Sequence, residues 1–364
     1  MKNDRPILLC AGGTGGHLFP AEALAVALGK RGASVELATD DRALKYGADF
    51  PARAIHAIAS ATPTGGSVLS KAAAALVLAR GTVAAWFLMG RIKPRVVVGF
   101  GGYPTVPPLL AASQRGIPTI LHEQNAVMGR ANRFLARRVK AIATGFPELG
   151  GVDAAIRAKA HHTGNPVRAA VLAAAAIPYP GFGDGKLRLL VTGGSQGARV
   201  MSDIVPMAIE LLAPEARARL VVVQQARGED EARVAAIYAR LGLACEVKPF
   251  FADLPMRLAQ AHLVIARSGA STVSELAVIG RPAILVPFPF ALDNDQAANA
   301  AELAKTGAVT VIKQAEFTAI WLAAQLMQAL NAPEALISRA LAAKQAGIAD
   351  AAERLADLVM QVGG

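Results

Sequence analysis

The sequence predicts an α/β protein built from two similar halves, each a parallel β-sheet with crossover helices. Three observations support this prediction. Glycine-rich turns occur at residues 11–17 and 192–199, and each directly follows an apolar run. Gly12 and Gly193 occupy the same place in these turns, so one strand–turn–helix plan occurs once in each half. Strand-like and helical segments alternate along the chain, which is typical of parallel sheets.

Ten short apolar runs are expected to be strands. The first half contributes residues 7–10, 34–38, 96–99, 119–121 and 141–143, and the second contributes 187–191, 220–223, 245–247, 263–266 and 283–286. In open α/β sheets ligands bind at the carboxyl ends of the strands. The glycine turns of both halves are therefore expected to face one cleft.

The joint between the halves is predicted at Gly164-Asn165-Pro166-Val167-Arg168. Asn-Pro breaks regular structure, and the Pro- and Gly-rich residues 177–185 then lead into the first strand of the second half. At 364 residues, with 53% hydrophobic and 18% charged residues, the chain is long enough for two cores and unlike a disordered protein.

The two cysteines and the N-terminal residues predict the cellular compartment of the protein. Cys10 and Cys245 lie in or beside apolar runs, without a CxxC pattern or a His neighbour, and both are expected to be reduced core thiols of a cytosolic protein. Residues 1–6 lead directly into a strand, with no apolar signal region, so export is not expected.

The excess of positive over negative charge lies entirely in the first half. Residues 1–165 hold 20 Lys and Arg against 9 Asp and Glu, whereas residues 166–364 hold 18 of each. Residues 68–92 are apolar apart from Lys71, Arg80 and Arg91 and contain no uncharged run long enough to span a bilayer. Such a helix suits an anionic membrane surface, and an ordinary core helix is the alternative. Nucleic acid is not expected as a partner, because aromatic residues are only 5% and no nucleic-acid-binding motif occurs.

The glycine turns predict anion sites, because they permit positive φ and precede helix N-termini. Neither turn matches G-x-G-x-x-G, so a nicotinamide enzyme is a poor second choice.

A third constellation follows the strand at 263–266. Arg267 and the next helix start suit a diphosphate, and Glu275 could bind a ribose diol; an N-capped helix with a favourable glutamate is the equal alternative. Residues 122–125 are four polar side chains after a strand, where binding groups or a solvated loop are expected.

Seven motifs in order resemble the MurG family within glycosyltransferase family 28. They lie at residues 11–17, 99–103, 122–125, 164–168, 193–199, 267–275 and 293–299, and so cover nearly the whole chain. The resemblance implies a GT-B fold with two Rossmann-like domains and a central cleft. It implies an acceptor- and membrane-binding domain at residues 1–164 and a UDP-N-acetylglucosamine-binding domain at 165–344. A helix of about residues 345–364 is expected to pack back onto the first domain.

The implied activity is transfer of N-acetylglucosamine (GlcNAc) from UDP-GlcNAc to the C4 hydroxyl of the N-acetylmuramoyl (MurNAc) sugar of lipid I, forming lipid II for peptidoglycan. Lipid I is undecaprenyl-pyrophosphoryl-MurNAc-pentapeptide. The enzyme is expected to lie peripherally on the cytoplasmic face of the bacterial inner membrane, with cell-wall synthesis proteins as possible partners. A glycolipid synthase with another lipid acceptor, such as diacylglycerol, and a non-catalytic sugar-nucleotide binder stay open as alternatives.

The resemblance also implies a donor site. Phe251 would present its backbone to uracil, Glu275 would hold the ribose, Ser195 and Arg168 the diphosphate, and Gln296 and Asn125 the sugar. The full set of expected substrate-binding residues is Thr14, Gly15, Gly16, Asn125, Arg168, Ser195, Phe251, Arg267, Ala270, Ser271, Thr272, Val273, Ser274, Glu275 and Gln296. Ser202 departs from the Asn usual in similar proteins, and Asp295 stands where some relatives carry a second Gln.

Catalysis requires a base for the acceptor hydroxyl. His17 has a suitable pKa range, and Glu123 is either the rival base or the group that orients His17. His17 could instead bind the acceptor's own diphosphate. The triplet Asp293-Asn294-Asp295 suggests a divalent metal, but arginines and helix N-termini can neutralise departing UDP, so no metal or other cofactor is expected.

Overall fold

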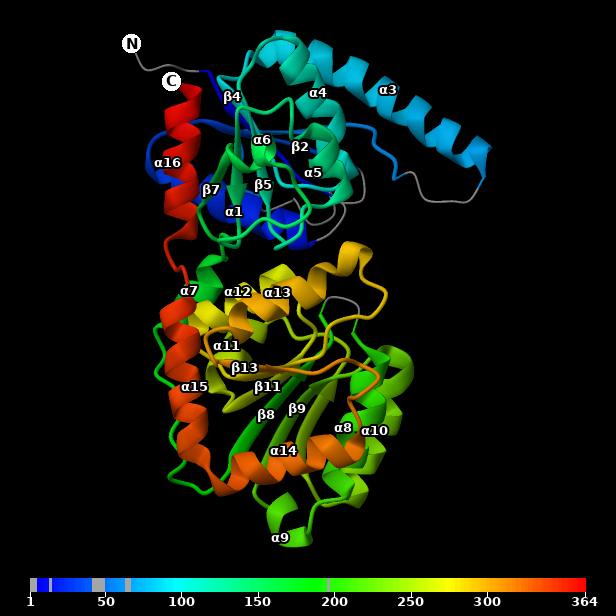
Figure 1. Ribbon diagram of the computed structural model, residues 1–364, viewed down its shortest axis with the longest axis vertical. Helices are drawn as coiled ribbons and strands as arrows, with labels where there is room; N and C mark the ends of the chain where they lie inside the picture. Colours follow the sequence, from blue (N-terminus) through cyan, green and yellow to red (C-terminus); the bar gives the residue numbers. More distant parts are fainter. Residues whose placement is uncertain (1–4, 13–14, 41–49, 63–66, 195–196) are drawn as a thin grey trace. The chain divides into compact units, whose positions relative to one another are not determined.

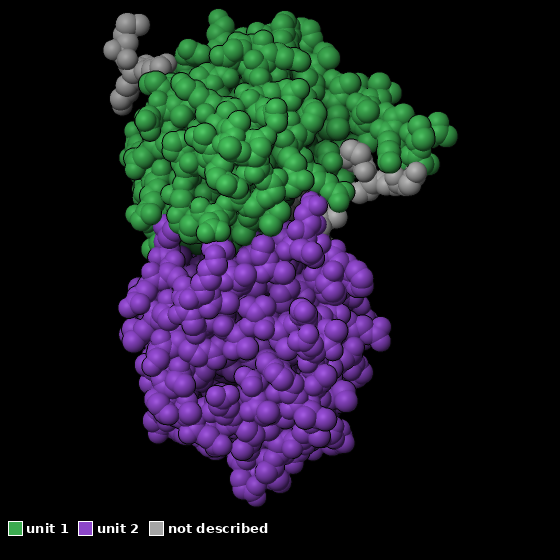
Figure 2. Space-filling view, in the orientation of Figure 1, with its two compact units in different colours: residues 1–168, 349–364 green, residues 169–348 purple. Residues whose placement is uncertain are grey.

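The computed structural model describes residues 5–12, 15–40, 50–62, 67–194 and 197–364 (Figure 1). The chain divides into two compact units, Met1–Arg168 with Ala349–Gly364, and Ala169–Ile348 (Figure 2). The first unit is therefore made of two separate stretches of sequence. We refer to them as unit 1 and unit 2.

Unit 1 contains a parallel sheet in the order β3-β2-β1-β4-β5-β6-β7. Its direction of growth reverses between β1 and β4, which is the switch point where ligands bind in doubly wound sheets. The strands are β1 (Ile7–Cys10), β2 (Val35–Thr39), β3 (Ala54–Ala57), β4 (Val96–Gly99), β5 (Thr119–Glu123), β6 (Ala141–Thr144) and β7 (Ala160–His162).

The period of two along each strand assigns side chains to two cores. Ile7 and Leu9 pack with α1 (Gly15–Lys30) and α16 (Ala351–Gly363) on one face of the sheet. Leu8 and Cys10 pack on the other face, against helices α3 to α6. These helices are α3 (Val68–Ile92), α4 (Val106–Gln114, after the short helix η1, Tyr103–Thr105), α5 (Arg130–Leu135) and α6 (Ala154–Arg157).

Helix α16 completes unit 1, although it comes from the C-terminal end of the chain. Leu355 and Val359 are fully buried in the core that it shares with α1. Arg31 at the end of α1 donates hydrogen bonds to Asp357 (2.6 Å) and Glu353 (3.2 Å). Apolar packing and this ion pair together fix the helix on α1.

Helix α3 buries one side and exposes the other. Ala85, Leu88 and Met89 are buried, and Gly81 passes so close to the Ala59 carbonyl that a Cβ would lie 2.1 Å from its oxygen. The exposed apolar side chains are Val68, Leu69, Leu76, Val83, Trp86 and Phe87. In the described part of the chain, α3 is the one helix whose length and composition would allow it to span a membrane. The alternative of an ordinary core helix does not fit this exposure.

Unit 2 contains a second parallel sheet in the order β10-β9-β8-β11-β12-β13, with its switch point between β8 and β11. The strands are β8 (Leu187–Thr192), β9 (Leu220–Gln225), β10 (Ala244–Lys248), β11 (Leu263–Ala266), β12 (Ala283–Leu285) and β13 (Val309–Val311). The predicted parallel sheets are thus confirmed in both halves.

Helices cover this second sheet. Apolar side chains of α8 (Arg199–Glu210), α10 (Gly228–Arg240) and α14 (Ala319–Asn331) share one core with β8, β9 and β11. The helices of a second group pack against one another. They are α7 (Ala169–Ala175), α11 (Leu254–Gln260), α12 (Ala270–Ile279), α13 (Asp295–Ala304) and α15 (Pro333–Ala346). The short helices α9 (Pro214–Arg217) and η2 (Leu292–Asn294) lie in connections.

All ten predicted strands are present, with ends that differ by at most two residues. Cys10 is buried as expected, whereas the prediction of a core thiol is wrong for Cys245, which is exposed in the edge strand β10. The sequence analysis missed β3, β7 and β13. Each of these three strands has three or four residues and lies at the edge of a sheet. Because an edge strand is covered less than a central one, its sequence need not be uniformly apolar, as β7 (Ala-His-His) illustrates.

Candidate active site

The first glycine turn follows β1 at the switch point of unit 1. Gly15 and Gly16 begin α1, and His17 lies in its first turn. The imidazole of His17 lies against Gly101 and Gly102, which follow β4 with φ of 88° and 72°. A Cβ on either glycine would be 3.4 Å from the ring, so the two glycines provide both the backbone conformation and the space for His17. Thr14 lies outside the described residues.

The environment of His17 keeps its imidazole neutral. Burial lowers the pKa of His17, and contacts with the Phe100 carbonyl and the Gln124 side chain partly offset that effect. His122, fully buried in β5, has its pKa lowered to about 4 by burial, and protonation of the nearby His17 would lower it further. His122 also packs beside the Phe100 ring, at 5.4 Å between centroids.

Gln124 and Asn165 connect the end of β5 to the joint between the halves. The Gln124 side chain donates to the Phe100 carbonyl (3.1 Å), and its own backbone carbonyl accepts a hydrogen bond from the Asn165 side chain (2.9 Å). Asn165 passes directly over Gly145, where a Cβ would lie 2.2 Å from the Asn165 side chain. The predicted joint is therefore anchored to the strand ends of unit 1.

Glu123 faces away from this cluster, because adjacent residues of a strand point to opposite sides. One carboxylate oxygen accepts from the Asn125 backbone (3.0 Å), and the other accepts from the Gly129 backbone (3.0 Å) and the Asn132 side chain (2.8 Å). Burial raises the pKa of Glu123, and these hydrogen bonds act in the opposite direction. The hydrogen bonds found for Glu123 lead to its own loop and none leads to His17, so the geometry does not favour the orienting role considered above.

Arg168 closes unit 1 beside α1. Its guanidinium lies 4.0 Å from the centroid of the Phe19 ring, which stacks beneath it. Its positive charge also lowers the pKa of Glu22, although burial raises that pKa more. Gly15 packs on the same Phe19 ring, where a Cβ would lie 3.0 Å away. Arg168 and the first glycine turn are thus brought together through Phe19.

The second glycine turn follows β8 and is held by Gln225, a residue that the sequence analysis missed. Gln225 Oε1 accepts from the Thr192 hydroxyl (2.9 Å) and the Gly193 backbone (3.1 Å). Its Nε2 donates to the carbonyls of Gly194 (3.0 Å) and Pro249 (3.1 Å). The signal in the sequence was two glutamines that end an otherwise apolar strand. Ser195 lies outside the described residues.

Arg267 is occupied by the protein itself. Its guanidinium donates to the carbonyls of Val286 (3.0 Å) and Pro287 (3.1 Å) and to the side chain of Gln314 (2.6 Å). It is buried, and burial lowers its pKa. Three of the five N–H donors of Arg267 are thus used within the protein, and its contact with a diphosphate stays a prediction.

The remaining donor-site residues gather at the carboxyl ends of β10, β11 and β12. Phe251 is buried after β10, with the Arg257 guanidinium 4.3 Å from its ring centroid. Ala270 to Glu275 form the first two turns of α12; Ala270 and Val273 are buried, and Ser271, Thr272, Ser274 and Glu275 are half-buried. Gln296 accepts from the Phe288 backbone (3.0 Å) through its side chain and from the Ser268 hydroxyl (2.8 Å) through its carbonyl.

Two further sequence observations have outcomes here. Ser202 is fully buried in α8, and its hydroxyl has no hydrogen-bond partner among the described residues. Burial raises the pKa of Asp295, and the nearby Asp293 acts in the same direction. In the described ranges, no group of three or more His, Cys, Asp or Glu side chains is placed to hold a metal ion.

Comparison with protein families gives two matches. Residues 7–144 match the N-terminal domain of glycosyltransferase family 28, and residues 188–355 match the C-terminal domain of the same family. The two matches include both glycine turns and nearly all of the strands of units 1 and 2; β7 lies between them.

Curated relatives match along almost the whole chain. One from Methylobacterium sp. (strain 4-46) is 61% identical over 98% of this chain and 96% of its own length. One from Rhodopseudomonas palustris (strain BisA53) is 56% identical, again over 98% of this chain and 96% of its own length. Both are named UDP-N-acetylglucosamine–N-acetylmuramyl-(pentapeptide) pyrophosphoryl-undecaprenol N-acetylglucosamine transferase.

Solved structures give the same result. MurG of Acinetobacter baumannii superposes with a TM-score of 0.79 at 30% identity, over 98% of this chain and 99% of its own. A UDP-GlcNAc 2-epimerase from Neisseria meningitidis, at 12% identity and a TM-score of 0.69 over 98% of this chain and all of its own, shares the fold alone. The predicted GT-B class of two Rossmann-like sheets and the family resemblance are both confirmed, and the chain belongs to glycosyltransferase family 28, with the MurG transferases.

Proposed function

We propose that this chain is an inverting glycosyltransferase that moves GlcNAc from UDP-GlcNAc to the C4 hydroxyl of the MurNAc sugar of lipid I, forming lipid II. The observation that carries the proposal is 61% identity, along 98% of the chain, to a transferase whose name states this sugar and this acceptor. A glycine turn at the switch point of each sheet gives each unit its own place for a phosphate-bearing ligand.

In this proposal His17 removes the proton from the acceptor hydroxyl as that oxygen attacks the anomeric carbon. Attack from the face opposite UDP inverts the configuration at that carbon. A base must be neutral to accept a proton, and burial favours the neutral imidazole. His17 Nδ1 is buried and has no hydrogen-bond partner among the described residues. The glycine pair Gly101–Gly102 leaves room for the ring itself.

Glu123 is assigned a positioning role. Its four accepted hydrogen bonds, two of them from Asn125, hold the loop between β5 and α5. Asn125, proposed to bind the donor sugar, is thereby fixed at the strand end. Burial raises the pKa of Glu123, but proton uptake on either oxygen would disrupt the hydrogen bonds that this oxygen accepts.

The donor site is proposed for the strand ends of unit 2, and Arg168, Asn125 and the first glycine turn, which belong to unit 1, are retained as proposed substrate-binding residues. Glu275, half-buried in the second turn of α12, would accept hydrogen bonds from the ribose diol. The Phe251 backbone would contact uracil, and Ser195 and the N-terminal residues of α12 would lie near the diphosphate. Gln296 would bind the sugar. Its side-chain oxygen already holds Phe288, which leaves its amide NH2 as the group for the ligand.

We further propose that α3 binds the cytoplasmic surface of the inner membrane. Leu76 and Phe87 are 64% and 66% exposed, and they belong to a helix that exposes six large apolar side chains. Arg115 places its guanidinium 3.6 Å from the centroid of the Trp86 ring, so cation and aromatic ring lie at one place on this helix. Apolar side chains beside cations favour an acidic lipid surface. A lipid-linked acceptor would be met there.

The test of the activity is incubation of the protein with radiolabelled UDP-GlcNAc and a short-chain lipid I analogue. We expect label in the analogue and none in diacylglycerol. Label in diacylglycerol would favour the other glycolipid synthase, and UDP-GlcNAc binding without transfer would favour the non-catalytic binder. A parallel reaction with excess EDTA is expected to proceed at the same rate; loss of rate that magnesium restores would favour a metal site at Asp293 and Asp295.

A further inference from the structure

The segment after β9 runs beside the second glycine turn. Gln225 binds the beginning of that turn through Thr192, Gly193 and Gly194, as described above. Two residues later, Arg227 meets its end: Gly197 has a φ of 67°, and a Cβ there would lie 3.0 Å from Cγ of Arg227. The described residues at the two ends of the turn thus contact this segment, with Gln225 at Thr192 to Gly194 and the stem of Arg227 against Gly197.

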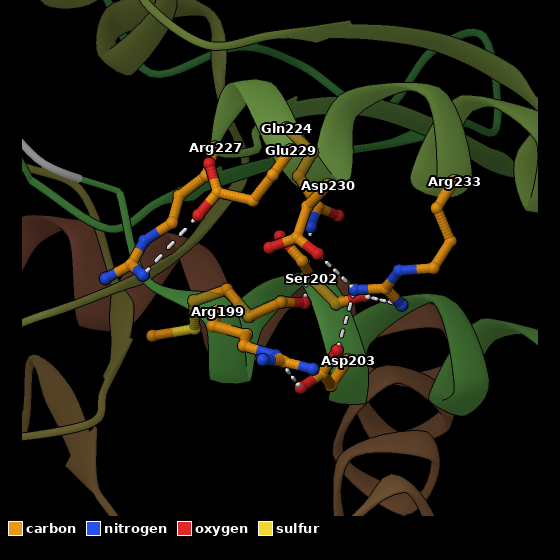
Figure 3. Close-up of polar contacts among 9 residues, drawn as sticks. Arg199, Ser202, Asp203, Gln224, Arg227, Glu229, Asp230 and Arg233 are labelled. Atoms are coloured by element: carbon orange, nitrogen blue, oxygen red, sulfur yellow. Dashed lines mark hydrogen bonds and ion pairs between the residues drawn. The ribbon is translucent and has the colours of Figure 1, made fainter.

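The guanidinium of Arg227 is weakly engaged. Its ion-pair partner is Glu229, at 3.8 Å, and the two side chains are 40% and 71% exposed. Arg233, six residues later, shows the contrast (Figure 3): it holds Asp203 at 2.7 Å and Asp230 at 2.6 Å. Arg227 Nε has no hydrogen-bond partner among the described residues. An exposed pair at such a distance contributes little, so Arg227 can exchange Glu229 for a stronger anion.

Arg267 is less available for this role, because its guanidinium already donates to Val286, Pro287 and Gln314. The positive charge of Arg227 nevertheless reaches it and adds to the lowering of its pKa. Two cations therefore act on one region beside the glycine turn, and Arg227 is the more exposed and the more weakly paired of the two. A diphosphate matches the charge and the forked donor geometry of that guanidinium.

We propose that Arg227 binds the diphosphate of the nucleotide at the second glycine turn. This inference rests on the proposed use of a UDP-sugar. Arg227 is placed as a binding residue, in the position that the sequence analysis gave to Arg267.

The test compares Arg227→Ala and Arg227→Lys with Arg240→Ala in the full-length protein. Arg240 is the last residue of α10, and Arg227 directly precedes its first. Arg240 is exposed and paired with Glu210 at 2.8 Å, so its replacement by Ala removes the same charge at the other end of this helix. Dissociation constants for UDP and uridine are measured by displacement of a fluorescent UDP analogue. We expect Arg227→Ala to weaken UDP binding about tenfold and to change uridine binding less than twofold. Arg227→Lys should lie in between, and Arg240→Ala should match the wild type.

Equal UDP affinity of Arg227→Ala and the wild type would overturn this inference alone. If the Michaelis constant of Arg227→Ala for the lipid I analogue rose while its UDP affinity stayed the same, Arg227 would bind the diphosphate of the acceptor, and the inference would again be overturned. Equal weakening of UDP and uridine would also overturn it, because the substitution would have disturbed the turn and not the phosphate contact. Failure of the wild-type protein to bind UDP would instead contradict the proposed function.

Discussion

Glu123 and Asn132 are joined by a 2.8 Å hydrogen bond that closes the loop between β5 and α5. Asn132 also donates to the backbone carbonyl of His122 (3.3 Å), so its one amide group binds both the backbone of β5 and the side chain of Glu123. All of these groups are buried. The arrangement makes the carboxylate part of the scaffold beside His17, and this leads to different expectations for the two residues.

Glu123→Gln should destabilise the protein more than it alters the chemistry. The amide NH2 of Gln would face an N–H group whose hydrogen bond the carboxylate now accepts, and that bond would be lost. We therefore expect the free energy of unfolding in urea to fall by about 1–3 kcal/mol. The pH dependence of kcat/KM should keep its shape. Loss of the acidic limb of that profile, with stability unchanged, would make Glu123 the base.

His17→Gln should abolish the proton transfer and leave the fold intact. We expect kcat to fall by about 10²- to 10⁴-fold, as for loss of a general base. In the wild type, the lowered pKa of His17 places the loss of kcat/KM below the usual histidine pKa of about 6.5, because the neutral form is the active one. That acidic limb should vanish in the variant. A variant with more than a tenth of the wild-type rate would leave His17 as a binding residue only.

Glu275→Ala should weaken the binding of UDP by about 1.5–3 kcal/mol, as expected for loss of a charged hydrogen-bond partner. Isothermal titration calorimetry measures this directly. Glu302→Ala is the matched control, since Glu302 lies on neighbouring α13 and is paired with Lys305 at 2.6 Å. Unchanged affinity of the Glu275 variant would remove this residue from the ribose site.

Exchange of Leu76 and Phe87 for Ser should reduce co-sedimentation with vesicles that contain anionic lipid, with UDP affinity unchanged. Wild-type binding should be weaker to neutral vesicles and should be lost near 1 M salt, where the Debye length is about 3 Å. Leu88 is unsuitable for this test because it is only 6% exposed and belongs to the core. Ile320→Ser with Leu341→Ser, two exposed apolar residues of unit 2, is the control. Equal loss in both double variants would contradict a specific role of α3.

The stability of unit 1 should fall in mild acid because of His122. Burial lowers its pKa to about 4 in the folded protein, whereas the unfolded chain takes up the proton near pH 6.5. The stabilising contribution of the neutral ring is therefore complete above pH 6.5 and decreases as the pH falls toward 4, by on the order of 3 kcal/mol. Urea unfolding of the wild type and of His122→Gln at several pH values should show their difference narrowing over this range. A constant difference would contradict the assignment.

The sequence predicted the central strands of both sheets because those strands are apolar on both faces. It missed β3, β7 and β13, since a short edge strand such as Ala160–His162 needs little apolar surface. The positions of His17 and Glu275 in the fold follow from strand ends and glycine turns, which the sequence shows.

The contacts inside the site could not be predicted in the same way. Whether a guanidinium faces a ligand or a carbonyl depends on residues distant in sequence, and Arg267 is held by Gln314, 47 positions away. The binding of the glycine turn by Gln225 is likewise a contact between two strands, β8 and β9. A motif gives the residue type at a position, and the fold decides its partners.

The contribution of α16 to unit 1 has a consequence for how the protein is made. A ribosome that has released residues 1–168 has produced a sheet whose α1 face still lacks Leu355 and Val359. Unit 2, encoded between the two stretches, is complete before α16 emerges. The N-terminal unit is therefore the last to be finished. A nascent chain halted before residue 351 would display an apolar surface that chaperones and proteases recognise, so truncated products would be removed before they reach substrate.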